Sequence, residues 1–479
     1  MEYQEFSTRL LSAYTKNNYP IFFSNKRNYF FSDIFNKEKL SEIYSLKRKL
    51  VICLSENTVD FMQIYLNLLN AGCVPLLVEA GIKNERLDYL LQLYRPYAVL
   101  APKEVSSERS LNFESNYIEN YKISYFKNNQ TAVHDNLAIL LGTSGSTGGT
   151  KFVRLSYKNL ISNANAIAEY LGLDNAEIPI TTLPPSYSFG LSIIHSHLIV
   201  GAKIVVTKKT FFDRDFWSLF NDAAVTSLSG VPYHYEILKK LKIFNMDLGN
   251  LKTFTQAGGS MSIDLLERFS SFCQEKNIKF FSMYGQTEAS PRMSYVPSGK
   301  AVTKSGTIGI AIPGGELNLV DENGKTITTS DTQGTLIYKG PNVFLGYANK
   351  GSDLSNGDEL NGVLNTGDIA IKDNDGYYKI IGRTNRFIKL FGNRVNLQDI
   401  EKYLLSKKIE SVCAGIDDNL MIFILESSKC DLSLVQKMIG EFLKLSKSIV
   451  SVYNVKAFPR NNSGKILYNH LVKSKLDKC

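Results

Sequence analysis

A glycine-rich stretch, LGTSGSTGGTK, runs from Leu141 to Lys151 and sets the strongest limit on the fold. It follows an apolar run, residues 137–141, that is typical of a buried strand. It precedes a segment in which Ser156 is expected to cap a helix ending near Leu171. Glycines let the backbone N–H groups of such a turn converge on an anion, while hydroxyl and ammonium side chains add donors and charge. The pattern predicts a phosphate-binding loop in an α/β fold.

The loop does not fit the Walker A motif. Read from Gly145, that motif would need a glycine at Thr150 and a serine or threonine at Phe152. A ligand for Mg²⁺ must therefore come from elsewhere in the chain. A flexible Gly/Ser linker is the alternative interpretation, but linkers rarely lie between a buried strand and a capped helix.

Length and composition indicate a globular protein with more than one core, since the chain has 479 residues, 44% of them hydrophobic and 21% charged. No apolar run approaches the ~20 residues that a membrane-spanning helix needs, and the first residues lack the apolar region of a secretory signal. We therefore expect no membrane span and a cytoplasmic location. The six cysteines lack metal-site spacing, which favours reduced thiols over a disulfide framework.

The net charge of +9 is concentrated near the C-terminus. Residues 386–479 contain 16 Lys and Arg against 9 Asp and Glu, a balance of +7, and the rest of the chain carries +2. Nucleic acid is not an expected partner, because a recognition motif and interleaved aromatic residues are missing. A phosphorylated small molecule or an acidic carrier protein would suit the same charge.

The apolar periodicity alternates between strands and helices along the first third of the chain. Predicted strands cover residues 49–54, 74–78 and 97–100, and predicted helices cover residues 58–70 and 84–94. This βαβ rhythm favours a parallel sheet, and it resumes after the glycine-rich loop. Short strands and turn dipeptides then indicate a β-rich subdomain from about residue 306 to 381, and a piece able to fold alone follows from about 386. We expect an α/β fold, with two parallel-type sheets and a β subdomain in a large N-terminal body and a small α+β C-terminal lid.

Three further motifs carry candidate chemistry. YGQTE, residues 284–288, ends a predicted strand, where open α/β sheets place ligands, and the Glu288 carboxylate is a candidate Mg²⁺ ligand. NTGD places Asp368 on a turn, where it is able to accept hydrogen bonds from both ribose hydroxyls. NNSGK places Lys465 on a loop near the C-terminus. Taken alone, each of these residues is also explained as an ordinary helix-end acid, turn residue or solvated lysine.

In this order, TSGSTGGTK, YGQTE, NTGD, GRTNRFIKLFGNRVNLQDIE and PRNNSGKI resemble the adenylate-forming superfamily of acyl-CoA synthetases, peptide-synthetase adenylation domains and luciferases. The resemblance implies that ATP and Mg²⁺ activate a small carboxylic acid to an acyl-adenylate, with release of pyrophosphate. Transfer to a thiol, that of CoA or of phosphopantetheine, would follow. The resemblance also implies a body of residues 1–384, a catalytic lid of residues 385–479 and a hinge at Asn385.

The resemblance further implies roles for individual residues. Tyr284 would stack on adenine, Thr287 would contact the α-phosphate and act in catalysis, and Glu288 would bind Mg²⁺. Asp368 and Arg383 would hold the ribose, while Lys465 would reach the α-phosphate and the attacking carboxylate. The loop residues that would bind the ATP phosphates are Thr143, Ser144, Gly145, Ser146, Thr147, Gly148 and Lys151.

The substrate-facing positions differ from the common pattern of the superfamily. Tyr187 stands where many acyl-activating members carry histidine, and Asn385 stands where an aspartate is common at the hinge. Four candidate pocket residues suggest an apolar acyl or aryl group with one polar contact: Tyr187, Phe189, Gly258 and Gly259. Two nearby histidines, His195 and His197, are expected to be buried or to line the pocket wall rather than to act as bases.

Three alternatives to an acyl-CoA synthetase remain at this point. A ligase that loads an acyl carrier protein would use the same residues and dock its partner on the basic lid. An adenylate-forming or amide-forming enzyme would lack transfer to a thiol. A non-catalytic nucleotide-binding relative would retain the fold alone, which the presence of Glu288 and Lys465 disfavours. CoA is the favoured acceptor because of the resemblance.

Overall fold

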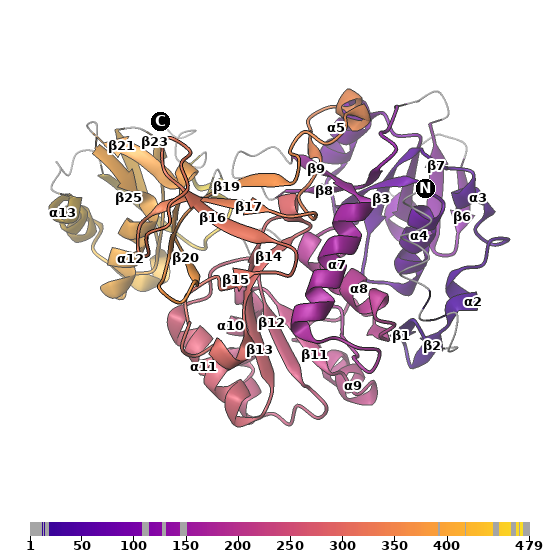
Figure 1. The fold of residues 1–479 in the computed structure, drawn as a ribbon, viewed down its shortest axis with the longest axis horizontal. Coiled ribbons are helices and arrows are strands. Elements are labelled where there is room, and N and C mark those ends of the chain that lie inside the picture. The colour runs from indigo at the N-terminus through magenta and orange to yellow at the C-terminus, as the bar shows by residue number, and fades with distance from the viewer. Residues whose placement is uncertain are drawn as a thin grey trace. The chain divides into compact units, whose positions relative to one another are not determined.

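A computed structural model (Figure 1) describes the following residues, without the side chains of residues 385, 387, 389, 393 and 394: 12, 14, 19–107, 115–126, 131–143, 151–390, 393–416, 418–443, 450–460, 466–468 and 470–472. These residues form two compact units. The first takes residues within Met1–Thr143, Thr150–Leu317 and Ile337–Leu364, and the second takes residues within Asn318–Leu336 and Asn365–Cys479. Each unit has its own hydrophobic core.

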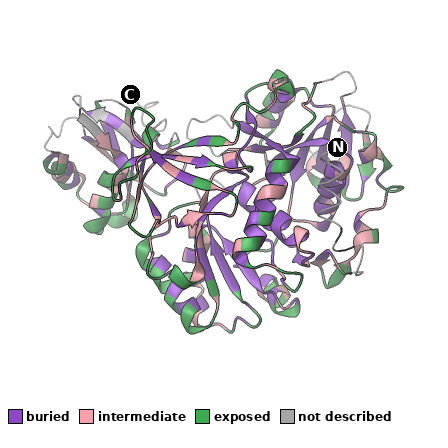
Figure 2. Ribbon diagram, viewed as in Figure 1, coloured by how far each residue is buried: buried purple, intermediate pink, exposed green. Residues whose placement is uncertain are grey.

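The first unit contains an eight-stranded mixed sheet with the order β18-β9-β8-β4-β3-β5-β7-β6. Its strands are β3 (Leu50–Ser55), β4 (Val74–Glu79), β5 (Ala98–Pro102), β6 (Ser115–Ile118), β7 (Tyr121–Tyr125), β8 (Leu137–Gly142), β9 (Phe152–Ser156) and β18 (Gly346–Ala348). The four central strands run parallel and both edges are antiparallel. Strands β3, β4 and β5 are almost entirely buried (Figure 2), as expected of strands covered on both faces.

The predicted helices next to this sheet are present, and Ser156 caps α7 as expected. Helix α4 (Val59–Asn70) begins after Thr58, whose hydroxyl accepts from the Phe61 N–H, and α5 covers Asn84–Tyr94. Helix α7 (Tyr157–Leu171) begins after Ser156, whose hydroxyl accepts from the Asn159 N–H, and it ends at Gly172 in the left-handed conformation. The βαβ prediction is therefore confirmed. Strands β6, β7 and β9 of this sheet are not among the predicted ones; β9 lies between the glycine-rich loop and α7, and Arg154 interrupts its apolar pattern.

A five-stranded sheet with the order β11-β12-β13-β14-β15 forms the second core of the same unit. Its strands are β11 (Ser227–Gly230), β12 (Thr253–Gln256), β13 (Lys279–Gly285), β14 (Arg292–Val296) and β15 (Ile310–Ala311). The first three are parallel, and β14 and β15 are antiparallel additions. The accompanying helices are α8 (Ser188–Ile199), α9 (Arg214–Asp222), α10 (Pro232–Lys240) and α11 (Ile263–Glu275). The α/β fold class is therefore confirmed, with sheets that are parallel at the centre and mixed overall.

The first unit also contains a small three-stranded sheet with the order β10-β1-β2. Its strands are β1 (Phe22–Ser24), β2 (Arg27–Tyr29) and β10 (Ile204–Val205). Three short helices complete the unit: α2 (Phe31–Ile34), α3 (Ser41–Tyr44) and α6 (Lys103–Ser107).

The second unit is built from three small sheets. Strands β16 (Glu316–Val320), β17 (Gly334–Lys339), β19 (Val363–Lys372) and β20 (Tyr378–Arg383) form one sheet in that order. Strands β21 (Phe387–Leu390) and β22 (Asn393–Asn396) form a hairpin, and β23 (Ser411–Ile416), β24 (Asn419–Leu425) and β25 (Val450–Val455) form the third sheet, accompanied by helices α12 (Leu397–Ser406) and α13 (Leu432–Leu443). The domain boundary before residue 385 and the movement of a lid stay predictions.

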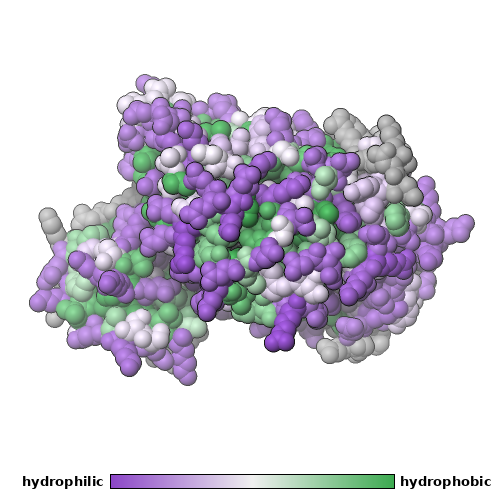
Figure 3. All heavy atoms as spheres, turned by 90° about the horizontal axis from the view of Figure 1, so that it is seen from below, coloured by the Kyte–Doolittle hydropathy of each residue, from purple (hydrophilic) through white to green (hydrophobic). Residues whose placement is uncertain are grey.

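The surface is mainly polar. The face drawn in Figure 3 is largely hydrophilic, with hydrophobic residues between the polar ones. Exposed apolar side chains such as Phe212, Leu405 and Ile416 come from separate elements. Within the described part of the chain, no helix combines the length and the apolar character needed to cross a bilayer.

Candidate active site

The two ends of the glycine-rich loop are held together by the backbone. The Thr143 N–H donates to the Lys151 carbonyl at 2.8 Å, and Gly142 at the end of β8 lies opposite Phe152 at the start of β9. The loop therefore leaves and re-enters one antiparallel strand pair. Thr143 and Lys151 are described by the structure. The other loop residues predicted to bind phosphate lie outside the described residues: Ser144, Gly145, Ser146, Thr147 and Gly148.

Tyr347 connects the predicted phosphate lysine with the predicted metal ligand. The Lys151 ammonium lies 5.4 Å from the centroid of the Tyr347 ring, a cation–π contact. The Tyr347 hydroxyl donates to Glu288 Oε1 at 2.9 Å. Burial raises the pKa of Tyr347, and the negative charge of Glu288 raises it further, so this hydroxyl keeps its proton. A cation and a carboxylate from distant parts of the sequence thus flank one ring.

A buried arginine holds Tyr347 in place. Arg154, fully buried in β9, donates to the Tyr347 carbonyl at 3.3 Å and to the Leu345 carbonyl at 3.2 Å. It also forms an ion pair of 2.9 Å with Glu359. A side chain at Gly346 would collide with both charged groups, because a Cβ there would lie 2.5 Å from Arg154 Nη2 and closer still to Glu359. These contacts fix β18 against β9 and so place the Tyr347 ring.

The YGQTE segment leaves β13 and meets the start of α8. Thr287 begins a 3₁₀ turn, Thr287–Ala289, and its hydroxyl lies 3.0 Å from the hydroxyl of Ser188. Ser188 is the first residue of α8. Tyr284 is partly buried near the end of β13, and the Gln286 amide lies 3.5 Å from its hydroxyl. The structure thus brings the predicted α-phosphate residue next to the segment that carries the predicted substrate pocket.

The predicted pocket residues lie on neighbouring elements of the first unit. A Cβ at Gly258 would lie 2.3 Å from the Tyr187 hydroxyl, and Gly258 has φ of +86°, so this position suits glycine on both counts. Burial raises the pKa of Tyr187 to about 12. Phe189 is buried, with the guanidinium of Arg292 4.3 Å from its ring centroid. Gly259 lies against Pro232.

The predicted ribose residues form a pair in the second unit. Asp368 on β19 lies opposite Arg383 on β20, and the Arg383 Nε donates to Asp368 Oδ1 at 2.6 Å. The Asp368 side chain is 1% exposed, whereas that of Arg383 is 47% exposed. The arginine therefore orients a buried carboxylate, while about half of its own side chain stays exposed. Their contact with ribose stays a prediction.

Two predicted functional residues have side chains that the structure does not describe. Lys465 lies in the range 461–465, outside the described residues. Asn385 lies in the 3₁₀ turn Thr384–Arg386 between β20 and β21, where its backbone alone is described. The roles of Lys465 in adenylation and of Asn385 as a hinge stay predictions.

The described side chains fit a Mg²⁺ ion that is coordinated mainly by phosphate oxygens. In the described ranges, no group of three or more His, Cys, Asp or Glu is arranged to hold a metal. Mg²⁺ in nucleotide sites takes one or two protein carboxylates and completes its shell with phosphate oxygens and water. The single carboxylate of Glu288 suits that mode of binding.

Sequence reasoning missed two residues next to this site. The sequence analysis assigns no role to Tyr347. Arg292 was not noted at all, although an arginine within the otherwise uncharged segment 289–296 was an available signal. The expectation for the two histidines fits their surroundings: His195 is buried and lies 2.9 Å from the Tyr65 hydroxyl, and His197 is buried beside a small cavity.

The fold and the site define a class of protein. A family profile described as AMP-binding enzyme matches residues 46–348, which is more than half of the chain, and the chain belongs to this family. Among curated relatives, a 2-succinylbenzoate–CoA ligase of Bacillus cytotoxicus is 25% identical over 448 residues, covering 91% of this chain and 90% of the relative. A medium-chain fatty-acid–CoA ligase of Escherichia coli is 28% identical over 348 residues, covering 69% of this chain and 60% of the relative.

Solved structures have the same fold. The o-succinylbenzoate CoA synthetase of Bacillus subtilis, in complex with its acyl-adenylate intermediate, superposes with a TM-score of 0.76 at 20% identity and covers 97% of both chains. The ATP-bound MatB of Rhodopseudomonas palustris superposes with a TM-score of 0.74 at 21% identity, covering 98% of this chain and 99% of the other. The chain is therefore an AMP-binding enzyme with the fold of these ligases.

Proposed function

We propose that this chain is an AMP-forming acid–thiol ligase that joins a carboxylic acid to CoA at the expense of ATP. Membership in the AMP-binding enzyme family carries the proposal, and the named relatives that are CoA ligases support it. The arrangement of Lys151, Tyr347 and Glu288 supports it independently, because it joins a cation and a metal-binding carboxylate beside a glycine-rich loop.

The first half-reaction brings two negatively charged groups together. A carboxylate oxygen of the acid attacks the α-phosphorus of ATP, and the bond from that phosphorus to the bridging oxygen of pyrophosphate breaks. Such a reaction needs positioning and charge neutralisation rather than a protein nucleophile. We assign neutralisation to Lys151 and Lys465, contact with the α-phosphate to Thr287 and orientation of the ribose to Asp368 and Arg383. Mg²⁺ held by Glu288 would neutralise phosphate charge when bound.

The second half-reaction exchanges AMP for a thiol. The sulfur attacks the acyl carbon, the mixed-anhydride bond to AMP breaks and the thiol proton passes to solvent. CoA is the proposed acceptor, on the names of the relatives. A phosphopantetheinyl carrier protein is the second candidate, since the balance of +7 in residues 386–479 suits either anionic partner.

A pyrophosphate-release assay with a panel of carboxylic acids tests the proposal. We expect release that depends on the acid, ATP and Mg²⁺, and thioester formation when CoA is added. Thioester formed with a phosphopantetheinylated carrier protein and not with CoA would reverse the choice of acceptor. Pyrophosphate without thioester from either acceptor would indicate an adenylate-forming or amide-forming enzyme. Absence of pyrophosphate with every acid would contradict the proposed function itself.

A further inference from the structure

Arg292 is a buried cation without an acidic partner among the residues that the structure describes. The residue is 2% exposed and lies at the start of β14. Its Nη1 donates to the Tyr170 hydroxyl at 3.2 Å and contacts the Met283 sulfur, and its Nη2 donates to the Ser192 hydroxyl at 3.3 Å. No ion pair joins it to a carboxylate among the described residues. A buried charge without a counter-ion costs several kcal/mol, so this position is incomplete as it stands.

One edge of the Arg292 guanidinium is available to a ligand. Its Nε is buried and has no hydrogen-bond partner in the described part of the chain. Its Nη2 carries two hydrogens, and Ser192 accounts for one of them. In arginine, the Nε–H and one Nη2–H lie on the same edge and point the same way. Two parallel donors at this spacing match the two oxygens of a carboxylate.

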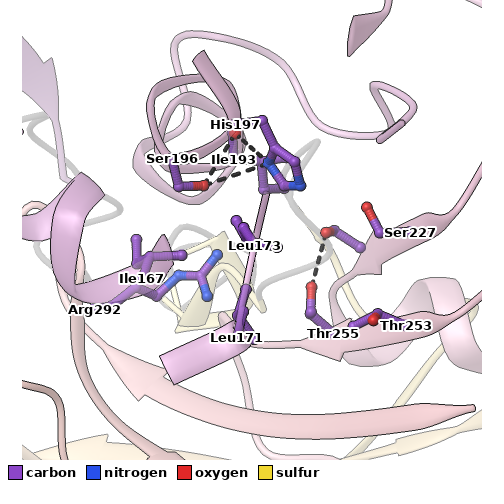
Figure 4. A pocket seen from close by; sticks show the side chains of 11 residues that line it. Ile167, Leu171, Leu173, Ile193, Ser196, His197, Ser227, Thr253, Thr255 and Arg292 are labelled. Carbon is purple, nitrogen blue, oxygen red and sulfur yellow. Dashed lines mark hydrogen bonds between the residues drawn. The ribbon is translucent and has the colours of Figure 1, made fainter. Parts of the chain in front are cut away.

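The same arginine lines a small cavity with two more unsatisfied groups. Figure 4 shows the guanidinium of Arg292 pointing into the ring of lining residues, with His197 and Ser227 also on that ring. His197 Nε2 and Ser227 Oγ, like Arg292 Nε, are buried and lack partners among the described residues. The free space is about 10 Å³, close to what one water molecule needs. The cavity therefore accepts a small polar group and not a long apolar chain.

The tautomer of His197 determines whether its Nε2 donates or accepts a hydrogen bond in the cavity. Its Nδ1 lies 2.8 Å from the Ile193 carbonyl, which only accepts, so Nδ1 carries the proton. Burial, with the charge of Arg292 adding to it, lowers the pKa of His197 to about 4, so the ring is neutral near pH 7. Its Nε2 then accepts from a hydroxyl or water beside the bound group. The positive charge of the cavity comes from Arg292.

Two contacts connect the proposed reaction centre with Arg292, which lines the cavity. Thr287, assigned to the α-phosphate, touches Ser188, and the next residue, Phe189, lies beneath the guanidinium of Arg292. An acid whose reacting carboxylate sits near Thr287 thus extends its other end across the first turn of α8. Family membership leaves the nature of that end open, because the relatives are named for a fatty acid and for 2-succinylbenzoate, and 2-succinylbenzoate has a second carboxylate.

We propose that the substrate is a dicarboxylic acid, whose second carboxylate binds the Nε/Nη2 edge of Arg292 with Ser227 as an additional donor. The proposal rests on the proposed function. The bound anion would supply a counter-ion for the Arg292 guanidinium and would place one carboxylate oxygen in the cavity. Arg292 would then reject acids with a purely apolar end, since they would leave a buried cation unpaired.

Matched pairs of acids test the proposal by pyrophosphate release. The pairs are linear dicarboxylates from succinate to sebacate with monocarboxylates of equal length, and the benzenedicarboxylates with benzoate. We expect kcat/KM for the best dicarboxylate to exceed that of its matched monocarboxylate by at least ~10²-fold, the scale of a charge-assisted bidentate contact. Arg292→Met should lower this ratio by at least ~10²-fold. Arg292→Lys should lower it by less, because lysine keeps the charge but lacks the two parallel N–H donors of the guanidinium.

Two further variants keep the test independent of folding defects. Ser227→Ala removes one hydroxyl and should lower the same ratio by ~10-fold. Arg268→Met removes an exposed arginine of α11 whose guanidinium lies over the ring of Phe244, and should leave the ratio unchanged. Thermal stabilisation by ATP and Mg²⁺ checks that each variant is folded. A wild-type preference for monocarboxylates, or an unchanged ratio in folded Arg292→Met, would overturn the inference and leave the proposed function standing. No pyrophosphate from any acid would overturn both.

Discussion

The Tyr347 hydroxyl donates a hydrogen bond of 2.9 Å to the carboxylate of Glu288, and the same tyrosine ring lies beneath the ammonium of Lys151. The hydrogen bond orients one carboxylate oxygen and leaves the other able to coordinate a cation. Residues next to a metal ligand commonly set its orientation and basicity. Tyr347 is therefore expected to support Glu288 without contacting the reacting atoms.

Substitution Tyr347→Phe removes this hydrogen bond and keeps the ring under Lys151. We expect kcat/KM for pyrophosphate release to fall by ~10-fold, with a higher Mg²⁺ concentration needed for half-maximal rate. Tyr14→Phe is the matched control, because the buried Tyr14 hydroxyl donates to the Ala202 carbonyl at 2.7 Å elsewhere in the first unit. An unchanged Mg²⁺ requirement in Tyr347→Phe would show that the hydrogen bond has no part in metal use.

Substitution Glu288→Gln tests the metal assignment directly. A hard dication prefers an anionic oxygen ligand, so the variant should need at least ~10-fold more Mg²⁺ and should use ATP less productively. Glu267→Gln, which changes an exposed carboxylate on α11, provides the control. Identical Mg²⁺ titrations for wild type and Glu288→Gln would remove Glu288 from the metal site.

Substitution Lys465→Ala tests whether this lysine acts in adenylation and not in thioester formation. Because the lysine charge is needed only where phosphorus is attacked, acyl-adenylate formation should fall by at least ~10²-fold, the scale of removing one transition-state donor. The variant should still convert chemically supplied acyl-adenylate to thioester. Lys456→Ala, at an exposed lysine beyond β25, is the matched control. A fully active Lys465→Ala enzyme would contradict the assignment.

Salt should separate acceptor use from adenylation. Residues 386–479 carry 16 basic and 9 acidic side chains, and exposed charges of this kind steer an anionic acceptor. Raising the ionic strength shortens the screening length to ~8–10 Å near physiological salt, so kcat/KM for CoA should fall more steeply than the rate of pyrophosphate release. Equal salt sensitivity of the two half-reactions would exclude this basic segment from acceptor binding.

Acid should destabilise the first unit through its buried histidines. Burial lowers the pKa of His195 to about 3 and that of His197 to about 4, below the ordinary value of 6.5. The unfolded chain then binds protons that the folded chain does not, so stability is retained above pH 6.5 and is lost as the pH falls toward 4. Between pH 7.5 and 5.5 each histidine should cost about 1.4 kcal/mol of unfolding free energy.

Urea unfolding at the two pH values measures this effect. His195→Gln removes one of the two titrating histidines. The loss of unfolding free energy that these two histidines cause between the two pH values should therefore fall by about half. His134, half-buried just before β8 and outside the core, is the site for a control substitution to glutamine. Equal pH dependence in wild type and His195→Gln would show that His195 titrates normally.

The sequence alone determined the fold class and the positions of most elements. The βαβ rhythm of the first hundred residues requires only local periodicity and caps, and both are visible in one dimension, as at Thr58 and Ser156. Strand β9 is one of the strands that the sequence analysis does not predict, since a fully buried arginine within it looks polar. Arg154 is tolerated there because four backbone carbonyls and Glu359 surround it, and these partners lie about two hundred residues further along the chain.

The sequence also indicated which residues carry the chemistry, because each lies within a short motif. It did not reveal what supports them. Tyr347 beside Glu288 and Arg292 above Phe189 are contacts between segments far apart in the chain, and no local pattern predicts a contact that forms only when sheets and helices pack. The charge of Arg292 is visible in the sequence. Its burial, the lack of a carboxylate partner within the described ranges and the cavity beside it are seen only in the tertiary structure, because burial and hydrogen-bond satisfaction are properties of packing.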